Sequence, residues 1–366
     1  MKKILFLGGL RPGGAEHQMV ILASLLKSDG YDVTYFSTDK SDFYVNKLHK
    51  AGISLIRIKE NQVIAKLRLN FIRLFFKLYK VISHNKYDTV ISFLGEWNFL
   101  NCILTRFRKT RHKAITGIRN NRDEVFLSSR ERFYAKFEKY AFCKVSNSYS
   151  AKEKYSLYYP ELMPKINVIY NIVDLKTVES IYECKKDNRI HIIVPASYNH
   201  VKNPMRLLEA VSLLSIKERE CLKIDWYGNI KDGVGLYNRM SDFINDKQIT
   251  NIVNLHDATP NILDYVNESD FVALFSTSEG LPNSICEGIM MGKPIIMSQV
   301  SDYNVLVDHN NGFLCNPYDV HSIRTVLSLV CSLSKEEILT LGFNSKLKAI
   351  NLFSKEIILQ QWKNII

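Results

Sequence analysis

Two glutamates eight positions apart, Glu279 and Glu287, flank a turn and a helix start in the stretch SEGLPNSICEGIMMGKP. An apolar, strand-like run precedes them. Pro282 suits the first turn of a helix, in which Asn283 and Ser284 would add backbone N–H donors. A helix N-terminus attracts phosphate, and a carboxylate can accept hydrogen bonds from sugar hydroxyls. The pattern therefore indicates a site for a sugar phosphate. The alternative is two solvated acids, with Glu287 favoured by the helix dipole.

A second candidate ligand loop lies near the N-terminus, in GGLRPGGAEHQMVILASLL, residues 8–26. Gly13 and Gly14 precede a helical pattern, so their backbone amides could reach an anion or sugar hydroxyls. Gly14-Ala15 stands where a P-loop requires Lys-Ser/Thr, and no GxGxxG fingerprint occurs, so ATP hydrolysis and NAD binding lack motif support. A plain tight turn is the alternative. Among nine dispersed histidines, His17 is the one that we would test for function.

Short β-branched runs alternate with helical stretches along the whole chain. The runs are apolar on both faces, which is typical of parallel sheets covered by helices. We therefore predict an α/β fold with two doubly wound domains, residues 1–170 and 171–353, and a last helix over 354–366 that could pack back on the first domain. The predicted strands are residues 3–8, 32–37, 53–58, 88–93, 113–118, 144–148, 190–194, 223–228, 251–256, 270–276 and 294–298.

The charge is concentrated in the first half of the chain. Residues 1–170 hold 30 Lys+Arg and 14 Asp+Glu, a balance of +16, and the remainder of the 49 basic and 37 acidic residues gives 19 − 23 = −4. This asymmetry suggests a polyanionic partner, namely a membrane surface, nucleic acid or a phosphorylated substrate, although a basic surface can also serve solubility alone. No nucleic-acid motif occurs, so we predict no nucleic-acid partner.

The cysteines and apolar runs indicate a cytoplasmic protein. Seven cysteines are scattered without a CxxC pair, which disfavours zinc ribbons and disulfide frameworks. The N-terminal apolar run is too short for a leader and is read as a buried first strand. No run of about 18 apolar residues occurs, so no membrane span is predicted.

A basic amphipathic helix is predicted over residues 64–82, IAKLRLNFIRLFFKLYKVI. At the helical period its apolar residues fall on one side and its lysines and arginines on the other, with Leu69 and Phe76 beside the basic residues. Docking onto anionic lipid is one interpretation, and RFRKTRHK, residues 106–113, adds a second basic cluster. The alternative is a helix packed by its apolar face and solvated on the other.

Several segments together carry a family resemblance. EGLPNSICEGIMMGKP is similar to the E-x7-E segment of retaining nucleotide-sugar glycosyltransferases of family 4, of the bacterial polysaccharide-biosynthesis type. GGLRPGGAEHQ resembles that family's opening glycine loop. The resemblance implies the GT-B fold, in which two Rossmann-like domains face a central cleft, the first binding acceptor and the second the nucleotide sugar. The further similar segments are VIYNIVD (168–174), PASYNHVKNPMRLLEA (195–210), SDFVALFSTSEG (269–280) and NGFL (311–314).

The resemblance also implies roles for particular residues. Glu287 would hold the nucleotide ribose, and Glu279 would contact hydroxyls of the donor sugar. Lys202 would contact the diphosphate and offset the charge that grows on the leaving group. Gly13, Gly14 and His17 would belong to the cleft loop of the first domain. The remaining donor-binding residues would be Gly280, Leu281, Asn283, Ser284, Ser197 and Asn171.

The sequence departs from the family at Ser197, where an arginine usually stands five residues before the lysine. Lys202 therefore lacks its customary second cation. Arg119, in ITGIRNN, is a candidate replacement at the end of a first-domain strand, and a neutral hydrogen bond from Ser197 is a weaker one. A surface salt bridge is the alternative for Arg119.

The reaction implied is sugar transfer with retention and without a cofactor, from a nucleotide-sugar donor of which UDP is the preferred nucleotide. The sequence contains no Asp-x-Asp and no metal-ligand cluster, so no metal is expected. The leaving diphosphate would help to take the acceptor's proton. A lipid-linked glycan acceptor, in surface polysaccharide or O-antigen synthesis, would fit the basic segments and place the enzyme at the inner face of the cytoplasmic membrane. The alternatives are a GT-B sugar-nucleotide epimerase and a catalytically silent sugar-nucleotide-binding protein.

Overall fold

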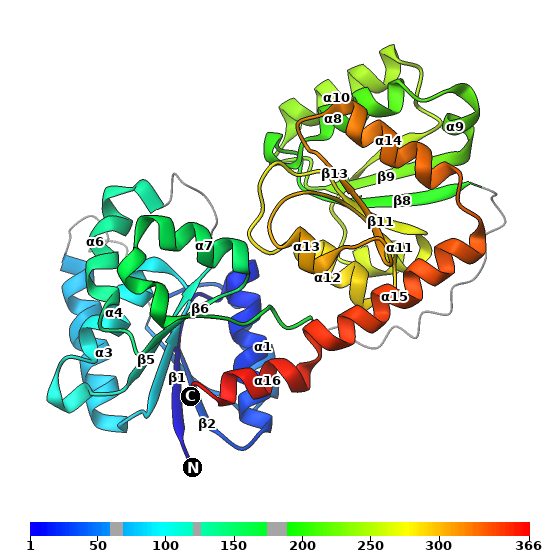
Figure 1. Cartoon of the computed structure of the whole chain (residues 1–366). Coiled ribbons are helices and arrows are strands. Elements are labelled where there is room, and N and C mark those ends of the chain that lie inside the picture. The colour runs from blue at the N-terminus through cyan, green and yellow to red at the C-terminus, as the bar shows by residue number, and fades with distance from the viewer. Residues whose placement is uncertain (59–68, 120–125, 174–188) are drawn as a thin grey trace. The chain divides into compact units, whose positions relative to one another are not determined.

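The computed structural model describes residues 1–58, 69–119, 126–173 and 189–366. The chain divides into two compact units (Figure 1). The first unit comprises Met1–Ile172 together with Lys355–Ile366, and the second unit comprises Val173–Ser354. Each unit is built around its own parallel sheet with helices on both faces.

The first unit contains a seven-stranded sheet within the described residues, in the order β3-β2-β1-β4-β5-β6-β7. Its order reverses between β1 and β4, which is the point at which doubly wound folds bind ligands at the carboxyl ends of their strands. The strands are β1 (Lys3–Leu7), β2 (Asp32–Ser37), β3 (Ser54–Arg57), β4 (Thr89–Ser92), β5 (Lys113–Ile118), β6 (Cys143–Ser146) and β7 (Ile166–Val168). The helices are α1 (Gly14–Ser28), α2 (Val45–Lys50), α3 (Leu69–Asn85), α4 (Gly95–Leu104), η1 (Arg108–Thr110), α6 (Ser129–Glu138), α7 (Tyr149–Tyr158), η2 (Pro160–Lys165) and α16 (Lys355–Lys363).

The second unit contains a six-stranded sheet within the described residues, in the order β10-β9-β8-β11-β12-β13. All its neighbouring strands are parallel. The strands are β8 (Ile190–Pro195), β9 (Leu222–Gly228), β10 (Val253–Asp257), β11 (Phe271–Leu274), β12 (Ile295–Ser298) and β13 (Gly312–Cys315). The helices are η3 (His200–Lys202), α8 (Pro204–Ser212), α9 (Ile216–Cys221), α10 (Val234–Asp246), α11 (Ile262–Glu268), α12 (Asn283–Met290), α13 (Tyr303–Leu306), α14 (Val320–Cys331) and α15 (Lys335–Phe353).

The predicted α/β class is confirmed, and each predicted run overlaps a strand. Most of their apolar residues are buried, as in β1, where Ile4 to Leu7 are fully buried. The predicted list missed β7 and β13, which are the last strands at one edge of each sheet. Neither strand is a run of buried apolar residues: the middle residue of β7, Asn167, is polar and exposed, and β13 is buried only at its first and last residues.

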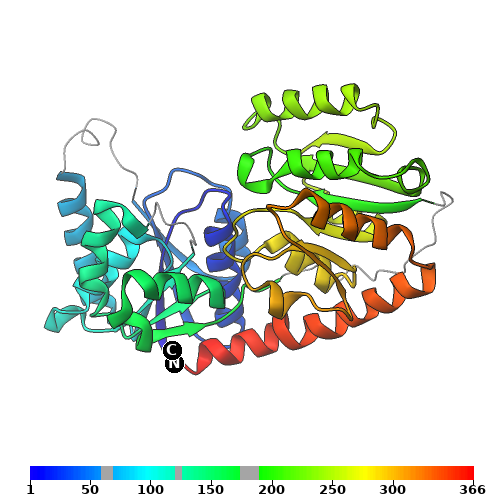
Figure 2. The ribbon, with the colours of Figure 1, turned by 45° about the horizontal axis from the view of Figure 1, so that its top comes forward.

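The chain returns to the first unit at its C-terminus. Trp362 of α16 is buried and packs against Phe93, with ring centroids 5.9 Å apart. Lys363 forms an ion pair with Asp29 of the first unit at 2.9 Å. Lys2 Nζ donates to the main-chain oxygen of Ile366 at 3.1 Å, so the two ends of the chain lie close together (Figure 2). In the described part of the chain, no helix is both long and apolar enough to cross a membrane.

Candidate functional site

The loop between β11 and α12 in the second unit carries several of the predicted site residues. Helix α12 begins at Asn283 after the N-cap Pro282, one residue later than the sequence pattern suggested. Leu281 is buried and fixes the approach to the helix, while the Ser284 amide lies in the first turn. Amides of a helix's first turn have no acceptor within the helix, so this end of α12 favours an anion. Ser301 Oγ donates to the Gly280 carbonyl and holds the loop from the neighbouring segment.

Glu279 and Lys202, the two residues with predicted catalytic roles, form an ion pair. Lys202 Nζ donates to Glu279 Oε1, and Ser276 Oγ donates to the same oxygen at 2.6 Å. Both charged side chains are mostly shielded, with exposed fractions of 22% for Lys202 and 13% for Glu279. The Thr277 amide also donates to the Val201 carbonyl at 2.8 Å. The loops that follow β8 and β11 are thus joined at the carboxyl edge of the sheet.

Glu287 lies in the second turn of α12 and is half-buried. Burial raises the pKa of its carboxyl to about 7. Among the described residues, none forms a hydrogen bond or an ion pair with this carboxylate. A half-buried carboxylate with both oxygens available can accept two hydroxyls of a ligand, and accepting them would favour its ionised form.

Asn203 is a site residue that sequence reasoning missed. Its backbone is in the left-handed region, with φ of 61°. Its buried side-chain amide donates to the Phe275 carbonyl at 3.1 Å and to the Pro317 carbonyl at 2.7 Å. Asparagine tolerates this backbone conformation better than most residues. The Asn-Pro pair after Lys202 was the available signal, because it marks a turn that leads into a helix.

Ser197 is exposed and accepts a hydrogen bond from Asn199 Nδ2 at 2.8 Å. Asn199 caps η3 by accepting from the Lys202 amide at 3.1 Å. Gly228, at the end of β9, lets the neighbouring backbone approach closely, since a Cβ there would lie 2.4 Å from the Ala196 carbonyl oxygen. These contacts fix the backbone around Lys202.

The glycine loop of the first unit contains a carboxylate that the sequence did not single out. Gly13 is the N-cap of α1 and Gly14 is its first residue. The Glu16 carboxylate lies against Gly13, where a Cβ would be 2.4 Å from one of its oxygens. His17 is exposed and stacks on Tyr44 with ring centroids 6.1 Å apart. Because Glu16 already supplies a negative charge at the helix N-terminus, the loop suits hydroxyls better than a second anion.

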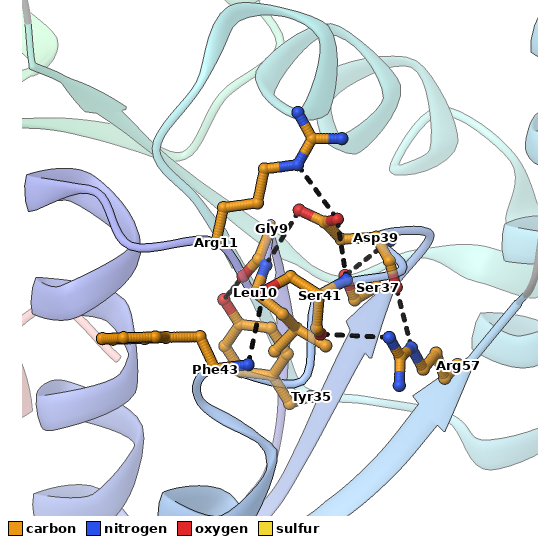
Figure 3. A network of polar contacts seen from close by, with 9 residues as sticks. All are labelled: Gly9, Leu10, Arg11, Tyr35, Ser37, Asp39, Ser41, Phe43 and Arg57. Carbon is orange, nitrogen blue, oxygen red and sulfur yellow. Dashed lines mark hydrogen bonds and ion pairs between the residues drawn. The ribbon is translucent and has the colours of Figure 1, made fainter. Parts of the chain in front are cut away.

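Asp39 follows β2 and connects the glycine loop to the segment after β2 (Figure 3). Its carboxylate accepts from the Leu10 amide at 3.4 Å, from Arg11 Nε at 3.1 Å and from the Ser41 amide at 3.1 Å. Burial alone would raise the pKa of Asp39, but these hydrogen bonds hold it below the usual value. Arg57 Nε donates to the Asp39 carbonyl at 2.7 Å. Sequence reasoning missed this network because its members belong to no local motif.

Arg119 follows β5, and its Nη1 lies 3.4 Å from Asn171 Oδ1. Both residues belong to the first unit. No carboxylate in the described ranges pairs with Arg119. The surface salt bridge, which was the alternative to a ligand-binding role, is therefore absent from these ranges. Its guanidinium instead lies over the Phe93 ring, 3.8 Å from the centroid.

The predicted basic helix is present as α3 in the described residues, and positions 64–68 lie outside them. Its face towards the core consists of Leu74, Leu78 and Ile82, which are buried, while Phe76 is exposed. The exposed basic residues of α3 are Arg73, Lys77 and Lys80. Phe107, which precedes η1, packs edge-on against Phe75 and Tyr79 of α3. The basic residues around Phe107 are exposed, namely Arg106, Arg108, Lys109 and Arg111. We call the exposed basic residues of α3 and of 106–111, with Phe76, the basic surface.

The described residues contain no group of three or more His, Cys, Asp or Glu side chains that could hold a metal ion.

Comparisons with known proteins show a similarity to a family over part of the chain. Residues 179–337 match the model of the family "Glycosyl transferases group 1". An uncharacterized glycosyltransferase of Haemophilus influenzae is 23% identical over 358 residues, which cover 97% of this chain and 96% of that protein. The capsular polysaccharide biosynthesis glycosyltransferase CapH of Staphylococcus aureus is 22% identical over 143 residues, and this match spans only 39% of either chain.

The fold is shared with solved glycosyltransferase structures. The Anabaena protein Alr3699/HepE, solved in complex with UDP and glucose, superposes with a TM-score of 0.80 at 17% identity and covers 100% of this chain and 99% of that one. The two sheets of this chain match those of such GT-B structures. Residues 179–337 are therefore similar in sequence to the glycosyl transferases group 1 family, and the chain has the GT-B fold that its sequence predicted.

Proposed function

We propose that the protein is a retaining glycosyltransferase that moves a hexose-type sugar from a nucleotide diphosphate donor to a lipid-linked glycan in bacterial surface-polysaccharide synthesis. The observation that carries the proposal is the contact among Ser276, Glu279 and Lys202 beside the start of α12, within the group 1 domain. A cation and a helix N-terminus at the carboxyl edge of a parallel sheet suit a diphosphate. Of the known structures with this fold, one holds UDP and glucose, which makes UDP-hexoses the first donors to test.

The proposed mechanism uses Lys202 as the cation that stabilises the departing diphosphate. Charge on the leaving oxygen grows as the sugar–phosphate bond breaks, so a fixed ammonium stabilises the transition state more than the ground state. Glu279, which itself accepts a hydrogen bond from Ser276, holds Lys202 in place before the donor binds. The Ser284 amide adds a neutral donor to the phosphates. The leaving phosphate oxygen then accepts the proton of the acceptor hydroxyl.

The two glutamates act as hydroxyl acceptors in this proposal. Glu287 binds the ribose and Glu279 binds the transferred sugar, while Gly280 and Leu281 contribute backbone contacts. The carboxylate of Glu287 is half-buried, so hydrogen bonds to it are less weakened by competing water. The paired-carboxylate mechanism of glycoside hydrolysis does not apply, because neither glutamate is proposed as the nucleophile.

The first unit is proposed to bind the acceptor, with the loop of Gly13, Gly14 and His17 close to the reacting hydroxyl. The basic surface is proposed to hold the protein on anionic lipid at the inner face of the cytoplasmic membrane, where a lipid-linked acceptor would be present. Exposed Arg, Lys and Phe side chains on one helix favour such binding through charge and apolar contact together.

A transfer assay tests the proposal directly. The full-length protein is incubated with each of a panel of UDP-, GDP- and ADP-sugars and with membrane extracts or synthetic polyprenyl-linked acceptors, and the product anomer is determined by NMR. We expect transfer from one nucleotide sugar with the donor's anomeric configuration retained. Interconversion of the free donor without transfer, or an inverted product, would contradict the proposal.

A further inference from the structure

Arg119 is held in an unusual position at the carboxyl end of β5. Its guanidinium lies 3.8 Å from the centroid of the buried Phe93 ring. Gly117 makes room for this ring, because a Cβ there would lie 2.6 Å from a Phe93 ring carbon. Trp362 of α16 packs against the ring and fixes it from another direction. The local sequence Gly-Ile-Arg thus places a guanidinium on an aromatic face.

The charge of Arg119 has little compensation within the described residues. Its Nη1 makes one long hydrogen bond, to Asn171 Oδ1 at 3.4 Å. Its Nε is shielded from solvent and has no partner there. Burial lowers the pKa of the guanidinium to about 9, so the surroundings disfavour the charge. The stack on Phe93 offsets only a part of that cost.

Two buried lysines among the described residues, Lys144 and Lys293, are paired with protein groups. Lys144 in β6 contacts the Glu138 carboxylate and donates to Thr116 Oγ1 at 3.2 Å. Lys293 donates to the carbonyl oxygens of Asn267 at 2.6 Å and Ser269 at 2.9 Å. Both lysines thus have oxygen acceptors that compensate the cost of burying their charge. Within the described residues no carboxylate offsets the charge of Arg119, which points to a ligand as the source of an anion.

Asn147 provides a second unsatisfied group at the same edge of the sheet. Ile118 and Ser146 are paired in register and end the adjacent strands β5 and β6, so Arg119 and Asn147 are the first residues after these strands. Asn147 is buried, and its Oδ1 has no hydrogen-bond partner in the described part of the chain. Buried polar atoms in native proteins are nearly always paired, and two exceptions at neighbouring positions indicate a ligand site.

We propose that Arg119 and Asn147 bind an anionic oxygen group of a substrate, a phosphoryl or a carboxylate, with the guanidinium facing the anion and Asn147 Oδ1 accepting a hydroxyl of the same molecule. The inference rests on the proposed function, because it makes the ligand a substrate of the transfer. Two sources can supply the group: the phosphates of the nucleotide donor, or an acceptor that carries a phosphate or carboxylate.

The first test compares Arg119→Met with Lys144→Met in the full chain. Arg119→Met removes an uncompensated charge, so its melting temperature without ligand should equal or exceed that of the wild type. Lys144→Met leaves Glu138 buried without its cation and should melt several degrees lower. Inorganic pyrophosphate should raise the melting temperature of the wild type, and its affinity by calorimetry should fall at least about tenfold in Arg119→Met.

A second variant adds an internal anion. Asn147→Asp places a carboxylate at the position next to Arg119, so it should raise the melting temperature and weaken pyrophosphate binding together. Arg119→Lys should restore part of the affinity, because an ammonium keeps the charge but not the forked geometry. If Arg119→Met lowers the melting temperature as much as Lys144→Met and leaves pyrophosphate affinity unchanged, Arg119 is structural and the inference is wrong.

The affinity of Arg119→Met for UDP shows which substrate supplies the anionic group. A loss of UDP affinity in Arg119→Met that parallels the loss for pyrophosphate identifies the donor phosphates. Unchanged UDP affinity with a raised KM for the acceptor identifies an anionic acceptor. Normal UDP affinity, acceptor KM and pyrophosphate affinity in Arg119→Met would overturn the inference and leave the proposed function intact. A wild type that binds pyrophosphate through Arg119 but no nucleotide sugar would overturn the proposed function instead.

Discussion

Lys202 Nζ donates a hydrogen bond to Glu279 Oε1, although the two residues are 77 positions apart in the chain. The contact joins a cation proposed to meet the diphosphate with a carboxylate proposed to meet the donor sugar. An incoming phosphate therefore competes with Glu279 for Lys202, and donor binding should loosen this ion pair.

Replacing Lys202 by Met should lower kcat by about 10²–10³-fold, because it removes a charge that acts mainly in the transition state. Glu279→Gln keeps an acceptor for Ser276 but ends the ion pair, and it should lower kcat/KM to a lesser extent. The effects of the two changes should be far from additive in the double variant, since the residues act as a unit. Steady-state kinetics with the preferred donor measure all three. Lys217→Ala, at an exposed position of the second unit, is the matched control. Strictly additive losses would show that the pair is not coupled in catalysis.

Nucleotide affinity should depend on pH through Glu287, whose pKa is raised to about 7 by burial. Only the carboxylate can accept both ribose hydroxyls, so UDP affinity should rise as the pH increases from about 6 to 8. Glu287→Gln should bind UDP more weakly at pH 8 and lose this part of the pH dependence. Calorimetric titration across the pH range is the measurement. A pH profile unaltered by the substitution would exclude Glu287 as its source.

The same raised pKa makes a prediction for stability. The folded protein holds the proton of Glu287 more tightly than the unfolded chain does, so this group lowers stability as the pH rises from about 4.5 to about 7, and the loss stays constant above that. Glu287→Gln should therefore melt higher than the wild type at pH 8 and at a similar temperature at pH 4.5, in the absence of nucleotide. A variant that melts lower at both values would show that the carboxylate stabilises the free protein.

Asn203→Ala should destabilise the second unit by about 2–4 kcal/mol. The change removes two buried hydrogen bonds and places a Cβ residue without a polar side chain at φ of 61°. Asn203→Gly loses the hydrogen bonds but tolerates the backbone, so it should cost less than Asn203→Ala. Urea unfolding monitored by tryptophan fluorescence separates the two. Equal losses for Gly and Ala would mean that backbone strain contributes little.

The basic surface should bind anionic vesicles in a salt-dependent manner. Reversing Arg73, Lys77 and Lys80 to Glu should reduce binding to vesicles containing phosphatidylglycerol by 10-fold or more, because each basic residue near such a surface contributes about 1 kcal/mol. Phe76→Ser should weaken binding at high salt as well, since it removes apolar contact. Sedimentation with vesicles provides the measurement, with neutral phosphatidylcholine vesicles as the control. If the triple variant still binds the vesicles, the basic surface is not the part of the protein that binds the membrane.

Much of the fold could be predicted from sequence because its signals are local. Apolar runs such as β1 and β11 are read from consecutive residues, and so is the turn that leads into α12. The strands β7 and β13 escaped prediction, since neither is a continuous buried apolar run and each is recognised as a strand only through its pairing with a neighbour. Among the candidate site residues, Lys202 and Glu279 were found through motifs, whereas Asp39 and Asn203 had no motif long enough to reveal them.

The sequence by itself determined the α/β class, the positions of the candidate ligand loops and the residue types that occupy them, because hydrophobic period and turn chemistry act over a few neighbouring residues. Only the tertiary structure decided that Lys202 meets Glu279, that Asn171 lies beside Arg119 and that Arg119 stacks on Phe93. The physical reason is that strand order and register bring together residues far apart in the chain, and the compensation of a buried charge depends on those neighbours rather than on the local sequence.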